Sequence, residues 1–284
     1  MSQVSVSTGD QFLRRSTPLP SLRLSSEMTF VPDSSVVADV IPSANYGDRR
    51  NGRDPDMIVL HYTGMADGRM AVHRLTTAGT EVSSHYIVHE DGRIIQSVQE
   101  AKRAWHAGAS AWAGENDINS CSIGVEIING GHDYGLPPYP LRQVAAVIAL
   151  CKGIIIRRNI PRQRVLGHSD ISPGRKQDPG EKFPWVLLAA SGVGQYVTPA
   201  KIEAGPTMAV GAAGDNVRAL QEALANYGYG VVVSSIYDFA TVEVVTAFQR
   251  HFRPELIDGV ADVSTVTTLK NLLTARSTDS PLTS

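Results

Sequence analysis

Two histidines and one aspartate could together bind a metal ion. His61 and His168 each end a short apolar run, and Asp178 follows in the glycine- and proline-containing segment 167–180. Two imidazoles and a carboxylate supply the three protein ligands of a catalytic zinc ion and leave a fourth position for water. One carboxylate is too few for calcium or magnesium, which prefer oxygen ligands. These residue types indicate one Zn²⁺ ion per chain, although the spacing of the histidines does not decide this alone.

A carboxylate and a cation elsewhere in the sequence could carry the catalytic steps. Glu126 lies in the apolar run 122–128, where burying a carboxylate is costly. We interpret it as a general base that takes a proton from water and returns it to a leaving amine. The alternative is an exposed glutamate on an edge strand. Lys176 precedes Asp178 by two residues, and in an extended segment both side chains would point to one side. It could stabilise an oxyanion there, or be a solvated loop lysine.

Aromatic residues and further histidines are candidates for substrate contact. Trp105 and His106 form a pair in the segment 104–108, and such a pair on a loop could line a cleft for sugar or peptide. His85 is a third candidate. Alternatively, it could be a buried core histidine or a residue that supports a metal ligand from behind. Weaker candidates for the cleft are Tyr62, Arg103 and Trp112. The remaining histidines are expected at the surface: His73, His89, His132 and His251.

The elements that must position these residues follow from the apolar pattern. Short apolar or alternating runs predict strands over 57–60, 84–89, 94–98, 122–128 and 165–168, and the segment 141–158 has helical spacing. Strands that alternate with helices predict an α/β domain, a mixed central sheet flanked by helices, over residues 41–196. Neighbouring strand ends in such a sheet converge on one crevice, so His61 and His168 can share a metal.

The second half of the chain predicts a smaller helical unit. Residues 197–214 contain several prolines and glycines and are interpreted as a linker. Helical patterns follow over 215–227, 240–252 and 263–273, and Asp238 and Asp262 can cap the last two helices. These segments predict a small three-helix domain over 215–276 that is independent of the sheet domain, followed by a tail over 277–284.

Composition excludes several classes of partner. The formal net charge is −2, which gives no global electrostatic reason to expect binding to nucleic acid or to an anionic membrane. Neither an integral membrane segment nor a secretory signal is found, because long apolar runs are missing. We therefore expect a cytoplasmic protein, with the periplasm or outer membrane as the alternative if it is exported or its start is misassigned. Residues 1–40 are expected to be a poorly ordered arm, and Cys121 and Cys151 to be buried.

Five sequence blocks resemble one enzyme family in their order. The blocks are HYTG at 61–64, SSHYIV at 83–88, AWHAG at 104–108, SIGVEI at 122–127 and GHSDISPGRKQDPG at 167–180. Over 55–196 the chain is similar to the type 2 N-acetylmuramoyl-L-alanine amidases, which share a fold with phage T7 lysozyme and the peptidoglycan-recognition proteins. The resemblance implies hydrolysis of the amide bond between N-acetylmuramic acid and L-alanine in peptidoglycan or muropeptides. It also implies that His61, His168 and Asp178 bind zinc and that Glu126 and Lys176 are catalytic.

The helical segments resemble a peptidoglycan-binding domain. Residues 215–273 share its pattern, although the glycine that usually precedes the second helix's aspartate is replaced by Tyr237. Together with the sheet domain, this likeness is closest to the outer-membrane amidases of Gram-negative bacteria. A bundle that only packs on the catalytic domain is the alternative.

Two other functions remain open from the sequence. A non-catalytic recognition protein of the same fold would lack a ligand or the base, and this chain keeps them all. A zinc peptidoglycan peptidase would carry a Glu-x-x-His element, which the sequence does not contain. A requirement for 1,6-anhydro-muramic acid, the stem-peptide preference and the oligomeric state do not follow from the sequence.

Overall fold

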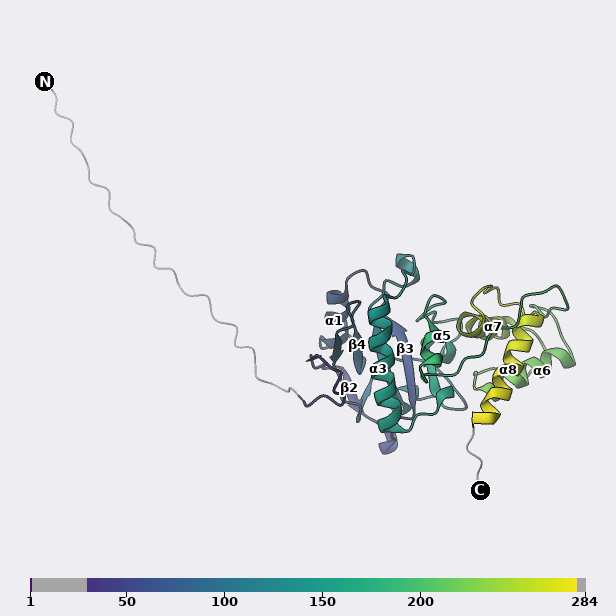
Figure 1. Cartoon of the computed structure of the whole chain (residues 1–284), viewed down its shortest axis with the longest axis horizontal. Helices are drawn as coiled ribbons and strands as arrows, with labels where there is room; N and C mark the ends of the chain where they lie inside the picture. Colours follow the sequence, from purple (N-terminus) through teal and green to yellow (C-terminus); the bar gives the residue numbers. More distant parts are fainter. Residues whose placement is uncertain (2–29, 280–284) are drawn as a thin grey trace.

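The computed structural model describes residue 1 and residues 30–279 (Figure 1). A sheet domain is followed by three helices that stand beside it, with α7 close to α5. Among the described residues no helix is long and apolar enough to cross a membrane. The predicted α/β class with a small helical domain is confirmed.

The described part of the chain contains a six-stranded mixed sheet with the order β1-β5-β4-β7-β3-β8. Strands β4, β7, β3 and β8 are parallel, whereas β5 is antiparallel to β4. Their bounds are Asp39–Val40 for β1, Met57–Tyr62 for β3, Tyr86–Val88 for β4, Ile94–Gln96 for β5, Ser122–Ile127 for β7 and Val165–Gly167 for β8. A separate antiparallel ribbon joins β2 (Tyr46–Asp48) to β6 (Lys102–Ala104).

Helices cover both faces of this sheet. The long helix α3 (Leu141–Arg158) and α5 (Trp185–Ala190) pack on one face, and α1 (Gly68–Thr76) packs on part of the other. Short helical segments complete the domain: η1 (Arg50–Gly52), α2 (Ile118–Cys121), η2 (His132–Tyr134), η3 (Arg162–Arg164) and α4 (His168–Ile171). The predicted strands and the helix over 141–158 are confirmed, and both cysteines are buried as expected.

The alternation of side chains along β3 separates the core from the site. Ile58 and Leu60 point to the face covered by α3 and belong to its apolar cluster. Met57 and Val59 point to the opposite face, and His61 follows them with the same period. In β7 the register pairs His61 with Glu126, so both side chains lie on the face away from α3.

The last part of the arm predicted over residues 1–40 does not match the prediction. Residues 30–40 are part of the fold, because β1 adds a parallel strand to the open edge of β5. The Asp33 carboxylate also accepts hydrogen bonds from the Gln96 side chain and from the Glu100 amide. An unpaired strand edge exposes backbone donors and acceptors, and the pairing with β1 satisfies those of β5. Residues 2–29 of the predicted arm lie outside the described residues.

The three helices form where the sequence predicted them. They are α6 (Asp215–Tyr227), α7 (Phe239–Phe252) and α8 (Val263–Asp279). The Asp238 carboxylate accepts the Thr241 amide at 2.8 Å, and the Asp262 carboxylate accepts the Thr265 amide at 2.7 Å, which confirms both predicted caps. Helix α8 continues into the segment predicted as a tail, and residues 280–284 lie outside the described residues.

The helical unit is not independent of the sheet domain, contrary to the prediction. One apolar cluster contains residues of both parts, and the buried ring of Trp112 lies between them. It meets Tyr227 and Tyr229 edge-on, with ring centroids 5.9 and 4.9 Å apart. The predicted linker is also fixed at Met208, which exchanges two backbone hydrogen bonds with Ala261. Sequence periodicity identifies an apolar helix face but not the surface that covers it.

The cap of α7 gives a first prediction. Replacing Asp238 with alanine leaves the Thr241 amide without its acceptor, so the free energy of unfolding should fall by about 1 kcal/mol. Urea denaturation measures this change. Asp238→Asn keeps a side-chain acceptor and should retain most of the stability, and equal losses in the two variants would contradict the capping role.

Candidate metal centre

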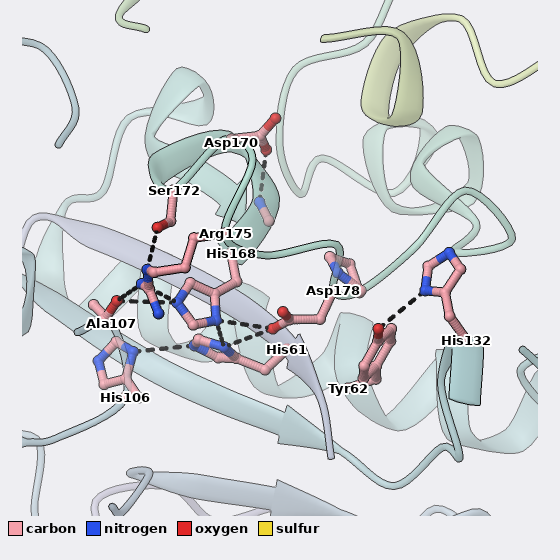
Figure 2. A network of polar contacts seen from close by, with 12 residues as sticks. His61, Tyr62, His106, Ala107, His132, His168, Asp170, Ser172, Arg175 and Asp178 are labelled. Carbon is pink, nitrogen blue, oxygen red and sulfur yellow. Dashed lines mark hydrogen bonds and ion pairs between the residues drawn. The ribbon is translucent and has the colours of Figure 1, made fainter. Parts of the chain in front are cut away.

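Three segments far apart in the sequence bring the predicted ligands together. His61 lies near the carboxyl end of β3, His168 begins α4 directly after β8, and Asp178 lies in the loop that follows. The Nδ1 atoms of the two histidines are 2.9 Å apart, and each is 3.0 Å from Oδ2 of Asp178 (Figure 2). All three residues are buried. The ends of parallel strands therefore converge as the sequence predicted.

Hydrogen bonds on the far side of each ring assign the tautomers of the ligands. Nε2 of His168 is 3.0 Å from the Ala107 carbonyl, which only accepts, so Nε2 carries the proton. Nε2 of His61 is 3.0 Å from Nδ1 of His106, and Nε2 of His106 is 3.2 Å from the Ser122 hydroxyl. A proton on each Nε2 atom satisfies this series of hydrogen bonds. Both Nδ1 lone pairs are then free and face the Asp178 carboxylate.

Burial and charge favour the protonation states that bind a metal. Burial lowers the pKa of His61 to about 4, and the nearby His168 adds to the effect, so His61 is neutral at pH 7. Burial alone would raise the pKa of Asp178, but the two histidines outweigh it and hold that pKa well below its usual value. A neutral His61 and an ionised Asp178 are the result.

This donor set fits a zinc ion. Tetrahedral zinc with ligands at ~2.0–2.1 Å places those ligands roughly 3.3 Å from one another. The three donor atoms lie close to that separation, and a single atom could contact them all. The backbone carbonyl on Nε2 of His168 is also a partner that commonly orients histidine ligands in metal sites.

A pocket of about 430 Å³ opens beside the three ligands and contains Glu126. β7 lies between β4 and β3, so Glu126 is not on an edge strand. Its Oε2 atom is buried and has no hydrogen-bond partner among the described residues. Burial raises the pKa of Glu126 well above its usual value, the charge of Asp178 adds to this, and Lys176 opposes it. A carboxylate in this setting is suited to proton transfer.

Two neighbouring cations lie at the same pocket. Lys176 is half-buried and lines it, as the sequence predicted. Arg175, which sequence reasoning missed, donates from Nη2 to the carbonyls of Ala107 and Ala109 at 2.6 and 2.8 Å. The first of these carbonyls also accepts from His168. Arg175 therefore fastens the loop after β6 to the segment 168–178, which carries His168 and Asp178 and is called the ligand loop below.

The residues predicted to contact substrate have different positions. Trp105 and His106 line the pocket, although His106 is buried and its ring also supports His61. It packs on Gly124, where a Cβ atom would be 2.5 Å from Cγ of the ring. The structure does not support substrate contact for His85, which is fully buried in the core and accepts the Gly124 amide. Of the weaker candidates only Tyr62 lines the pocket.

A buried carboxylate joins the ligand loop to the helical domain. Asp170 is fully buried in α4, two residues after His168, and accepts the Gly167 amide at 2.7 Å. It also accepts the hydroxyl of Tyr229 and Nδ1 of His251, each at 2.7 Å, from the helical domain. The expectation that His251 lies at the surface is wrong, because its ring is buried and stacks on a tryptophan of α5. Asp170, the aspartate that follows His168 in the block at 167–180, was the only sequence signal for this buried contact.

Comparison with protein families agrees with this arrangement. The family model of N-acetylmuramoyl-L-alanine amidases matches residues 51–181, which contain all three ligands and Glu126. The model of the peptidoglycan binding domain matches residues 213–269. The fold and site thus define an amidase domain followed by a domain of the peptidoglycan-binding class.

Individual relatives narrow the assignment. The N-acetylmuramoyl-L-alanine amidase AmiD of Escherichia coli is 36% identical over 76% of this chain and 82% of its own length. The 1,6-anhydro-N-acetylmuramyl-L-alanine amidase AmpD of Citrobacter freundii is 31% identical over 53% of this chain and 87% of its own length. The chain belongs to the N-acetylmuramoyl-L-alanine amidase family, as its sequence blocks predicted.

Solved structures of relatives have the same fold. AmiD of E. coli, in complex with the substrate anhydro-N-acetylmuramic acid-L-Ala-D-γ-Glu-L-Lys, aligns with a TM-score of 0.67 over 80% of this chain and 91% of that chain, at 36% identity. AmpDh3 of Pseudomonas aeruginosa in complex with anhydromuramic pentapeptide aligns with a TM-score of 0.66 at 30% identity, over 91% of this chain and 99% of that chain.

Replacing Asp170 tests the link between the ligand loop and the helical domain. Asp170→Ala leaves buried donors of Tyr229 and His251 unpaired, so the free energy of unfolding should fall by about 3 kcal/mol or more. Urea denaturation measures the loss. Asp54→Ala, at an exposed position, is the control and should change stability by less than about 0.5 kcal/mol. Equal stability of the two variants would contradict the link.

Proposed function

We propose that this chain hydrolyses the amide bond between N-acetylmuramic acid and L-alanine in peptidoglycan or its muropeptide fragments, and that it depends on one zinc ion. The observation that carries the proposal is the donor set: two imidazole Nδ1 atoms and the Asp178 carboxylate face one point beside Glu126. The amidase activity named for AmiD and AmpD supports the same reaction.

His61, His168 and Asp178 would hold the zinc ion in this reaction. When bound, zinc supplies a Lewis acid that polarises the substrate carbonyl and lowers the pKa of water. Two neutral histidines and one carboxylate leave the ion less positive than three histidines would, so water activation depends more on a protein base.

Glu126 is the group suited to move the proton. Its carboxylate takes the proton of the attacking water as the tetrahedral intermediate forms. The same carboxyl group then returns the proton to the nitrogen of L-alanine as the amide bond breaks. Its raised pKa suits both steps, because the group must hold the proton between them. Lys176 lines the same pocket, and its ammonium group is the cation suited to stabilise the oxyanion.

Substitution of the base tests the mechanism. Glu126→Gln keeps the shape of the side chain but cannot accept the proton, so kcat should fall by about 10²–10⁴-fold. The zinc content, measured by atomic emission, should stay at one ion per chain because Glu126 is not a ligand. Mass spectrometry of digested muropeptides should detect release of the intact stem peptide by the unaltered chain. Unchanged kcat in Glu126→Gln refutes the base, and loss of terminal D-alanine refutes the amidase reaction.

Removal of the metal gives a separate prediction. Dialysis against a strong chelator should abolish muropeptide cleavage, and stoichiometric Zn²⁺ should restore it, while Mg²⁺ should not because it prefers oxygen ligands. Zinc should also raise the melting temperature of the chelated protein, since it binds the folded state. Full activity in protein shown to be free of metal would exclude zinc dependence.

The helical domain would hold the enzyme on polymer. Its match to the peptidoglycan binding domain family supports this role. A sedimentation assay with insoluble peptidoglycan measures the interaction, with chelated protein used so that the polymer stays intact. A chain that remains in the supernatant would leave the helical domain with a packing role only.

A further inference from the structure

Tyr62 is a pocket residue to which the proposed reaction gives no part. It directly follows the ligand His61 in β3 and lines the same pocket as Glu126. In Figure 2 it lies on the opposite side of Asp178 from His106. The side chain is half-buried, so one part contacts protein and the other is accessible from the pocket.

The Tyr62 ring packs against two glycines. A Cβ atom on Gly131 would be 2.5 Å from Cε2 of Tyr62, and Gly131 has a φ of +66°. On Gly64 a Cβ atom would lie 3.4 Å from the same ring atom. Any larger residue at 131 would displace the ring, so the backbone fixes where the phenol lies.

The hydroxyl group is held by a histidine, which is itself held by a carboxylate. The Tyr62 hydroxyl is 3.0 Å from Nδ1 of His132 (Figure 2). On the other side of the ring, Nε2 of His132 is 3.0 Å from the Glu181 carboxylate. Arg250 of α7 lies 3.7 Å from the same carboxylate. His132, which was expected at the surface, is half-buried, and both of its ring nitrogens make hydrogen bonds.

We infer that Tyr62 is a substrate-binding residue whose hydroxyl group contacts a secondary amide beside the scissile bond, and that His132 and Glu181 are the residues that position it. This inference rests on the proposed amidase function. The Glu181 carboxylate only accepts, so Nε2 of His132 donates to it and Nδ1 accepts from the Tyr62 hydroxyl. The phenol oxygen is then left to accept from an amide N–H of the substrate. The substrate carries such amides on both sides of the bond, namely the acetamido group of the sugar and the peptide bond after L-alanine.

The arrangement favours binding over a role in packing alone. A tyrosine that only filled space would not need a histidine on its hydroxyl, nor a carboxylate and a cation of another domain behind that histidine. Holding the ring before substrate arrives removes the loss of side-chain freedom on binding. His132 and Glu181 both lie outside the ligand set, so they can be changed without altering a metal ligand.

Kinetics with a muropeptide substrate test the inference. Tyr62→Phe should raise KM and lower kcat/KM by about 3- to 10-fold, the effect of one neutral hydrogen bond, with kcat little changed. His132→Phe should have a smaller effect in the same direction. Tyr134→Phe, at an exposed tyrosine, is the matched control and should leave both constants unchanged. Zinc content and melting temperature identify any variant whose fold has suffered, because a structural defect lowers kcat instead.

A double-mutant cycle tests whether His132 acts through Tyr62. Adding His132→Phe to Tyr62→Phe should lower kcat/KM no further, because the hydroxyl that His132 orients is then missing. Multiplicative effects would overturn the positioning role, and unchanged KM in Tyr62→Phe would overturn the inference. If the unaltered chain cleaves no muropeptide, the proposed function fails instead.

A modified substrate identifies the amide. In a depsipeptide muropeptide an ester replaces the peptide bond after L-alanine and removes its N–H donor. If Tyr62→Phe then loses its penalty, the hydroxyl binds the stem peptide. If the penalty remains, the contact is to the acetamido group of the sugar, and either result supports the inference.

Discussion

The position of one proton on each ligand imidazole is the constraint on which the site depends. A histidine binds a metal only through a nitrogen that carries no proton, and here Nδ1 must be that atom in both rings. The Ala107 carbonyl and the ring of His106 impose this state through the Nε2 atoms on the far side of each ligand ring. Each of these partners belongs to the loop after β6, so the position of that loop determines whether the ligand set forms. Arg175 fastens the loop, although it is not itself a ligand.

The helical domain takes part in the same arrangement. Asp170 lies between the ligand loop and two side chains of the helical domain, and the apolar cluster around Trp112 continues across the boundary. A carboxylate with no solvent exposure is stable only when its oxygens are fully hydrogen-bonded. The helical domain supplies two of the three donors. The backbone of α4, and with it His168, is therefore supported by a part of the chain that contains no ligand.

Sequence reasoning identified the elements and the ligands because both leave local signals. Apolar runs gave the strands, helical spacing gave α3 and the three C-terminal helices, and the block at 167–180 gave His168 and Asp178. It failed where a role depends on contacts between distant segments. His85 and His251 are buried because other elements cover them, and no pattern near either residue reveals that cover. The shared core was missed for the same reason, since a bundle of this size has the same periodicity whether it stands alone or packs.

The fixed contact between the two parts also limits how the enzyme can meet its polymer. Two modules on a flexible tether search a volume set by the length of the tether. Here the predicted linker pairs with Ala261, and the rings of Trp112 and Tyr229 meet across the boundary. The separation between the pocket and any peptidoglycan strand that the helical domain binds is therefore constant. Cleavage would therefore be confined to bonds at one set distance and orientation from the point of attachment.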